Sequence, residues 1–182
     1  MNTGVISVRY AKALLAYATE QGVEDAVYDS MKQLVEVIRE VKEFAVLLRN
    51  PRLEPLRRVE IICSVMPSSH VVRRFVELVV KAEREDMLVF MAHEYMTLYR
   101  KKKGICAVKF TTAVPMDEIT ETGIRNMLEG VESCKVEIEY RDDVSLIGGF
   151  RMEMDSRRID ASIQGQLSRI RKKIVKQNRK LV

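Results

Sequence analysis

The sequence has no tryptophan and little glycine or proline. Its 182 residues include 8 Gly and 4 Pro, and only 6% are aromatic. Turns and irregular loops depend on glycine and proline, so their scarcity disfavours a loop-rich β-sandwich or barrel. The chain is nevertheless 47% hydrophobic, which is enough for an ordinary buried core. We therefore expect a mainly α fold.

Long hydrophobic runs and clustered cysteines are also missing. No segment approaches the roughly 20 apolar residues of a membrane-spanning helix, so we expect membrane contact only through a partner or at the surface. The three cysteines, Cys63, Cys106 and Cys134, lie far apart. This spacing matches neither a zinc site nor a disulfide framework. We interpret all three as free thiols in a reducing compartment.

No nucleotide-binding motif is present. The pair Gly148 and Gly149 is the stretch closest to a phosphate loop, but the G-x-x-x-x-G-K-[ST] pattern is absent and an alternating, strand-like segment follows. We interpret the pair as a structural turn, where glycine permits a bulge or a close backbone approach. An enzyme using Glu137, Glu139 and Asp143 is a remote alternative without a predicted pocket. We predict no catalytic residue, no metal site and no cofactor.

Hydrophobic spacing divides the chain near residue 104. Before it, apolar residues recur with helical spacing in about six segments, including one over 42–51 that ends at a proline. This predicts an N-terminal helical bundle over 1–104. Beyond it, β-branched and alternating segments predict a small α/β module over 105–182, in the order strand–helix–strand–strand–helix.

Positive charge is concentrated at the end of the chain. The segment 156–182 carries nine Lys or Arg against the single acid Asp160, so its net charge is +8 and the rest of the chain carries −3 of the total +5. The closing helix also has an apolar stripe, which we expect to dock onto the sheet: Ile163, Leu167, Ile170 and Ile174. Its basic side then favours an acidic protein partner or a membrane surface. An RNA-binding or ribosome-associated protein is the alternative, although aromatic residues for base stacking are absent from this helix.

Three segments of the chain carry a resemblance to a known family. They read RYAKALLAYATEQG, LLRNPRLEPLRRVEII and DDVSLIGGFRMEMDSRRIDASIQGQLSRIRKKI. Together they resemble the delta subunit of F-type rotary ATP synthases, the oligomycin-sensitivity-conferring protein family, along the whole chain. The third segment is the most specific. Departures include Val144, where members commonly have proline, and Ala161, where glycine is common.

The resemblance implies a non-catalytic stator subunit without a cofactor. In this family the N-terminal bundle binds the N-terminal helix of an alpha subunit at the catalytic head. The C-terminal module binds the C-termini of the b-subunit stalk. One copy per complex then resists rotor torque and couples proton flow to ATP synthesis. The implied location is peripheral, at the cytoplasmic face of a bacterial inner membrane, and no nucleic acid is expected.

The resemblance also suggests which residues contact these partners. The alpha-subunit helix is expected in a groove between the first and fifth helices, at Tyr10, Ala13, Leu14, Tyr17, Val72, Phe75, Val76 and Val79. The stalk is expected at Phe150, Arg169, Lys172, Lys173 and Lys176.

Overall fold

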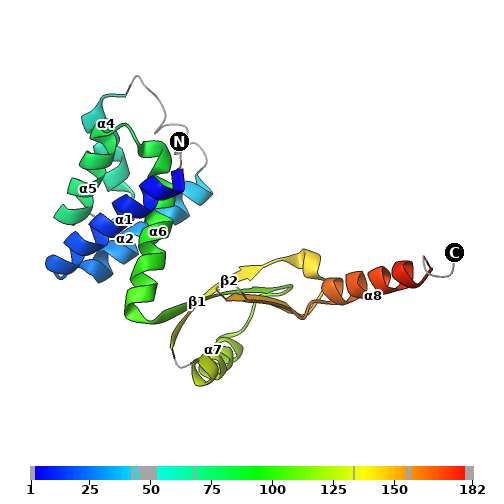
Figure 1. Ribbon diagram of the computed structural model, residues 1–182. Helices are drawn as coiled ribbons and strands as arrows, with labels where there is room; N and C mark the ends of the chain where they lie inside the picture. Colours follow the sequence, from blue (N-terminus) through cyan, green and yellow to red (C-terminus); the bar gives the residue numbers. More distant parts are fainter. Residues whose placement is uncertain are drawn as a thin grey trace. The chain divides into compact units, whose positions relative to one another are not determined.

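The chain forms two compact units in a computed structural model, Met1–Lys102 and Lys103–Val182 (Figure 1). The structure describes residues 3–41, 44, 53–67, 69–132, 134–154 and 157–178. Over these residues it contains seven α-helices and one four-stranded sheet. The predicted mainly helical fold with a small sheet is therefore confirmed.

The N-terminal unit is a helical bundle. Its described helices are α1 (Thr3–Glu20), α2 (Glu24–Glu40), α4 (Pro55–Ser64), α5 (His70–Lys81), the short 3-10 helix η1 (Glu85–Met87) and α6 (Leu88–Lys103). The helix expected over 42–51 lies outside the described residues, apart from the helical Phe44. Proline at the start of α4 suits a first helical turn, where its missing N–H leaves no hydrogen bond unmade.

Two tyrosines of α6 fix this helix against the start of α2. The hydroxyl of Tyr95 donates to the carbonyl oxygen of Glu24 at 3.0 Å, and that of Tyr99 donates to Oδ1 of Asp25 at 2.8 Å. Burial raises the pKa of Tyr95, so its hydroxyl keeps the proton that it donates. The bundle therefore aligns these two helices by directed hydrogen bonds as well as by apolar packing.

The C-terminal unit is a four-stranded sheet with two helices. Its elements are β1 (Ile105–Thr112), α7 (Glu118–Glu132), β2 (Lys135–Asp142), η2 (Val144–Leu146), β3 (Phe150–Met154), β4 (Arg157–Asp160) and α8 (Ile163–Asn178). The strand order is β2-β1-β3-β4, with β1 parallel to β2 and antiparallel to β3. A small core joins α7 to the sheet through Val108, Leu128, Val136 and Met154.

The module contains one strand more than the sequence predicts. Strand β4 pairs antiparallel with β3, so that Arg158 lies opposite Glu153 and Asp160 lies opposite Arg151. Its four residues include only one aliphatic side chain, so they show no hydrophobic alternation. Short, charged strands are typical of sheet edges, where charge discourages pairing with other chains.

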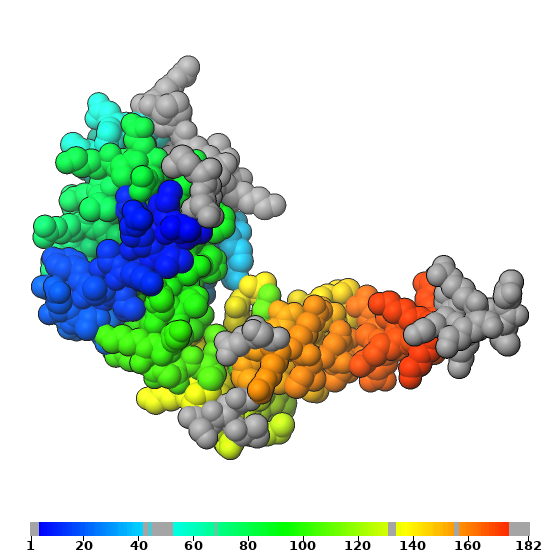
Figure 2. Space-filling model, viewed as in Figure 1, coloured from blue at the N-terminus to red at the C-terminus, as the bar shows by residue number. Residues whose placement is uncertain are grey.

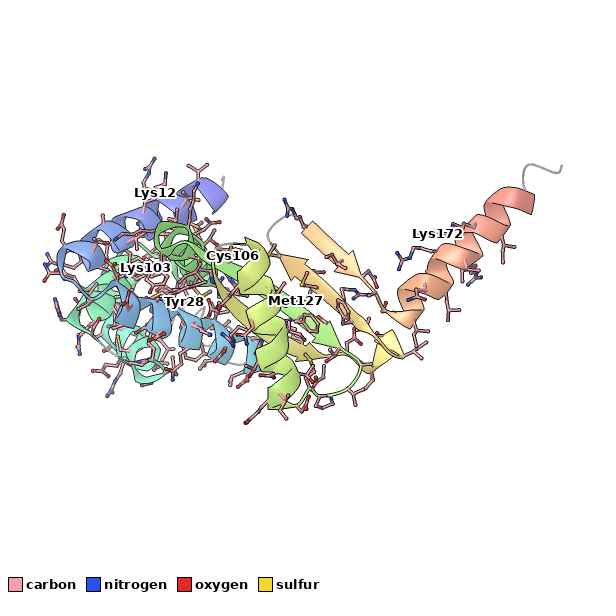
Figure 3. The ribbon with its side chains drawn as sticks, turned by 90° about the horizontal axis from the view of Figure 1, so that it is seen from below. Lys12, Tyr28, Lys103, Cys106, Met127 and Lys172 are labelled. Atoms are coloured by element: carbon pink, nitrogen blue, oxygen red, sulfur yellow. A yellow bond between two sulfur atoms is a disulfide. The ribbon has the colours of Figure 1, made fainter. Side chains whose placement is uncertain are left out.

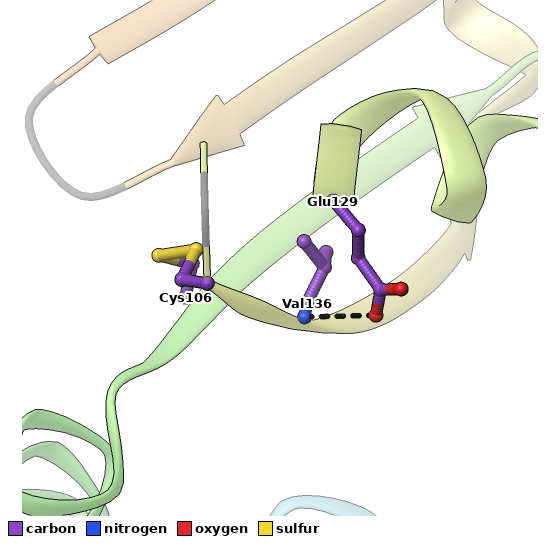
Figure 4. Close-up of a disulfide and its surroundings, with 4 residues drawn as sticks. Cys106, Glu129 and Val136 are labelled. Atoms are coloured by element: carbon purple, nitrogen blue, oxygen red, sulfur yellow. Dashed lines mark hydrogen bonds between the residues drawn. A yellow bond between two sulfur atoms is a disulfide. The ribbon is translucent and has the colours of Figure 1, made fainter. Parts of the chain in front are cut away.

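The prediction of three free thiols is wrong for two of them. Cys106 and Cys134 form a disulfide, with their Cα atoms 6.1 Å apart (Figure 4). The cause is the parallel pairing of β1 with β2, which aligns Ile105 with Lys135 and brings together cysteines separated by 28 residues. Cys63 remains free, and burial raises the pKa of its thiol.

Reducing this disulfide should destabilise the C-terminal unit. A cross-link of this loop length is worth about 2–4 kcal/mol, because it restricts the unfolded chain. We expect urea unfolding, followed by circular dichroism, to show that loss on adding dithiothreitol to the full chain. Cys63→Ser, as the control, should show the same loss. Identical unfolding of the reduced and oxidised wild-type chain would contradict the prediction.

Gly148 and Gly149 form the turn between η2 and β3. The carbonyl oxygen of Gly148 accepts a hydrogen bond from the N–H of Ile163 at 3.0 Å, which ties the turn to the start of α8. Gly149 has φ +76°, and a Cβ at this position would lie 2.4 Å from the carbonyl oxygen of Ala161. Only glycine fits this backbone conformation and this close approach.

Gly149→Ala should therefore lower the free energy of unfolding by about 2–4 kcal/mol, since backbone strain and a backbone clash act together. Gly130→Ala is the matched control, because a Cβ there would meet nothing within 4 Å. Gly130 lies in α7, so alanine there should raise stability by up to about 1 kcal/mol. Chemical denaturation of both variants measures the difference, and equal effects would contradict this role for Gly149.

Candidate functional site

A groove of about 400 Å³ opens between α1 and α5, and both helices reach the surface on the face drawn in Figure 2. We call it the α1/α5 groove. Its lining is mostly apolar: Arg9, Tyr10, Ala13, Leu14 and Tyr17 from α1, and Val71, Arg74, Phe75 and Leu78 from α5. Spacings of three and four residues on each helix place these side chains along one face of it.

Helix α5 presents two neighbouring stripes to different surroundings. Val72, Val76 and Val79 are completely buried in the bundle core. The stripe that includes Phe75 and Leu78 is rotated from it toward α1, and Leu78 is 53% exposed. Helical geometry explains this, because residues one position apart differ by about 100° around the axis.

The predicted groove residues are therefore only partly brought together. Tyr10, Ala13, Leu14, Tyr17 and Phe75 line the groove. The expectation that Val72, Val76 and Val79 line the groove needs correction, because their side chains are completely buried in the core and are not part of its lining. Sequence reasoning missed Arg9, Val71, Arg74 and Leu78. The missed residues of α5 include an arginine, whereas the predicted set of Val72, Phe75, Val76 and Val79 is entirely apolar.

Two arginines hold the tyrosines of the groove. Nη1 of Arg84 donates to the hydroxyl of Tyr10 at 3.0 Å, and Nη1 of Arg74 donates to the hydroxyl of Tyr17 at 3.4 Å. Each guanidinium also lies near the face of its tyrosine ring, at 5.5 and 5.7 Å from the centroid. With Arg9, these groups give an apolar groove a positive border.

The apolar stripe of α8 does not dock onto the sheet, so that prediction is wrong. Its four side chains are between 45% and 55% exposed: Ile163, Leu167, Ile170 and Ile174. The opposite side of α8 meets the strand end instead. Nη2 of Arg169 donates to the carbonyl oxygen of Asp160 at 2.8 Å, and a Cβ on Gly165 would lie 2.6 Å from Oδ1 of Asp160. These contacts turn the stripe away from the strands, and α8 projects beyond the sheet (Figure 3).

The residues expected to bind the stalk lie in separate places. Phe150 is 36% exposed and stacks on Phe110, with ring centroids 5.1 Å apart. Arg169 and Lys172 line a polar cavity of about 320 Å³ beside β3 and β4. Lys173 is exposed. The side chain of Lys176 lies outside the described part of the structure.

The charge balance of that polar cavity is positive. Arg151 and Asp160 also line it, and Nε of Arg151 lies 3.5 Å from Oδ2 of Asp160. Hydrogen bonds from the Ser162 hydroxyl, at 2.6 Å, and from the Ser162 N–H lower the pKa of Asp160. The carboxylate is therefore ionised at neutral pH, and it offsets one of the three basic side chains there.

The carboxylates considered for catalysis have local structural partners. Oδ1 of Asp143 accepts the N–H of Ser145 at 3.0 Å and so caps η2. Glu139 pairs with Arg141, whose Nη2 lies 2.6 Å from its Oε1. Over the described residues, no group of three or more His, Cys, Asp or Glu could hold a metal ion. In that same part of the chain, no helix is both long and apolar enough to cross a membrane.

Comparisons with known proteins agree along nearly the whole chain. The family model described as ATP synthase delta (OSCP) subunit matches residues 6–174. The ATP synthase subunit delta of Bacteroides fragilis is 39% identical, with all of both chains covered, and that of Phocaeicola vulgatus is also 39% identical over all of both chains. The subunit of a Methylobacterium species is 30% identical, with 92% of this chain and 90% of the relative covered.

A solved structure has the same fold. A chain in the mitochondrial ATP synthase hexamer of Toxoplasma gondii aligns with a TM-score of 0.73, covering 93% of this chain and 97% of that one at 15% identity. At this identity the likeness concerns the fold alone. The full-length relatives and the family match confirm the membership that the three sequence segments predict. This chain belongs to the ATP synthase delta (OSCP) subunit family.

Proposed function

We propose that this non-catalytic stator subunit holds the catalytic head of the ATP synthase through its N-terminal unit and the peripheral stalk through its C-terminal unit. Family membership makes it a structural subunit of the synthase, and the RNA-binding alternative has no support. Resistance to rotor torque requires two separate attachments. The chain has two compact units to provide them.

The N-terminal helix of an alpha subunit is the proposed occupant of the α1/α5 groove. The groove itself is the observation that carries this proposal, because its apolar lining comes from two neighbouring helices and it is open at the surface. Such a groove takes an amphipathic helix, whose side chains at positions i, i+3, i+4 and i+7 enter it. The positive border formed by Arg9 and Arg74 favours a helix with carboxylates beside its apolar face.

The C-terminal unit is proposed to bind the C-termini of the b-subunit stalk. Its exposed positive groups, including Arg171 and Lys173, and the partly exposed ring of Phe150 support this assignment. One copy per complex would link the stalk to the head. The subunit would then be peripheral, at the cytoplasmic face of the bacterial inner membrane.

A binding measurement tests the assignment of the groove. The full chain is titrated with a synthetic peptide of the alpha-subunit N-terminus from the same organism, in a calorimeter. We expect a Kd of about 1 µM or tighter, which corresponds to about −8 kcal/mol. A peptide with the same composition in scrambled order is the control. Equal binding of both peptides, or no heat from either, would overturn the assignment.

A further inference from the structure

The exposed side of α8 has the spacing of a helix-pairing seam. We call Ile163, Leu167, Ile170 and Ile174 the α8 stripe. Its members are separated by four, three and four residues and are 45%, 55%, 54% and 52% exposed. Successive steps of four and three are the d-a-d-a pattern of a heptad repeat, in which apolar side chains meet those of a second helix. About two heptads suit a short helix-to-helix contact.

Basic residues border the α8 stripe. In this heptad assignment the e positions are Gln164 and Arg171, and the g positions are Gln166 and Lys173. Residues at e and g lie beside the seam and select the partner by charge. No acidic side chain occupies either edge between 163 and 174. If a second copy of the chain bound here, the basic residues at the two sets of e and g positions would repel one another. A helix with acidic residues at these positions would be attracted.

The other basic residues of α8 lie on the opposite side. Arg169 and Lys172 occupy positions c and f, and both line the polar cavity beside the strands. Arg169 is already engaged by the carbonyl oxygen of Asp160. Adjacent lysines thus face different surroundings, with Lys173 beside the stripe and Lys172 away from it.

We propose that the α8 stripe binds an α-helix that has aliphatic residues at its own a and d positions and carboxylates at its e and g positions. This inference rests on the proposed stalk attachment and specifies its chemistry. The contact is made by the stripe and its edge residues Arg171 and Lys173. The basic side with Arg169 and Lys172 stays outside it.

Synthetic helices provide a direct test with the full chain. One peptide has three heptads with Leu at a and d and Glu at e and g, and a second has Lys at e and g. Fluorescence anisotropy of labelled peptides gives both affinities. We expect the Glu peptide to bind at least about tenfold more tightly than the Lys peptide, because charges at e and g select partners. Equal affinities, or no binding of the Glu peptide, would overturn the proposal.

Neighbouring lysines supply a matched pair of variants. Lys173→Glu and Lys172→Glu change the net charge equally, at exposed positions on different sides of one helix. We expect Lys173→Glu to lower the affinity of the chain for the Glu peptide about three- to tenfold. Lys172→Glu should change this affinity by less than about twofold, since charge pairs act over short distances in salt. Leu167→Asp should weaken it by more than about tenfold, because it places a charge in the seam. Equal effects of the two lysine variants would contradict the assigned face.

A second binding partner separates this inference from the stalk assignment. The soluble C-terminal part of the b subunit is titrated into the wild-type chain and into Leu167→Asp. If the b segment binds the wild-type chain and Leu167→Asp weakens this binding, the result supports both the α8 stripe as the contact and the stalk assignment. Binding that Leu167→Asp leaves unchanged overturns the α8 stripe as the contact and keeps the stalk assignment. Failure of the b segment to bind, alongside tight binding of the Glu peptide, overturns the stalk assignment and keeps the stripe.

Discussion

Ala13→Trp should abolish binding of the alpha-subunit helix to the α1/α5 groove. Ala13 lies in the groove and is exposed, so the larger side chain would occupy the space of the partner without disturbing the core. We expect the Kd to rise at least about 100-fold, since interface anchors and the pockets that receive them carry most of the binding energy. Calorimetry with the alpha-subunit peptide measures this change.

Lys12→Trp is the control for this variant. Lys12 is the preceding residue of the same helix, is exposed, and does not line the groove. The same aromatic side chain is thereby added at a neighbouring position on another side of α1. We expect wild-type affinity and an unchanged unfolding transition. If both variants bound the peptide like the wild type, the partner would have to sit elsewhere.

Glu85→Gln should produce the largest loss of stability among the predicted variants. Arg58 of α4 forms an ion pair with Glu85 of η1, and their side chains are only 15% and 7% exposed. Removing the carboxylate would leave a guanidinium charge in a site with little water. Breaking a buried pair in this way costs about 3–5 kcal/mol. Chemical denaturation followed by circular dichroism measures the loss.

An exposed pair on the same helix provides the comparison. Arg57 and Glu60 lie 3.1 Å apart and are 72% and 56% exposed. Glu60→Gln should change stability by less than about 1 kcal/mol, because water and salt already screen these charges. The double variant Arg58→Met/Glu85→Met should recover much of the loss caused by Glu85→Gln, since it removes both buried charges. A double variant as unstable as Glu85→Gln would show that the unpaired charge is not the cause.

The candidate groove could be predicted only in part. The family resemblance placed Tyr10, Ala13, Leu14 and Tyr17 of α1 in a groove, and all four line the α1/α5 groove. On α5, the predicted residues Val72, Val76 and Val79 are buried in the core, and Phe75 alone of the predicted set lines the groove. A partner-binding face must remain stable in water before it binds, so it mixes apolar side chains with charged ones such as Arg74. A face with this mixture is harder to recognise from the hydrophobic periodicity of the sequence.

Local patterns gave no indication of contacts between distant segments. Cys106 and Cys134 meet only because two strands pair in parallel after a crossover helix. Strand β4 has too few apolar residues to be recognised, and its pairing with β3 defines it. Each of these features depends on residues that lie opposite one another in the sheet, and sequence spacing does not show which residues those are.

The sequence alone determined the family, because its motifs carry the resemblance. Periodicity along the chain indicated the helical N-terminal part, the mixed α/β C-terminal part and the division between them near residue 104. Only the tertiary structure decided what each face meets. In the structure, Val72, Val76 and Val79 lie in the core and Phe75 lines a groove. The α8 stripe is exposed to water. The physical reason is that helical spacing tells which side chains share a face, whereas the packing of neighbouring elements decides which faces they cover.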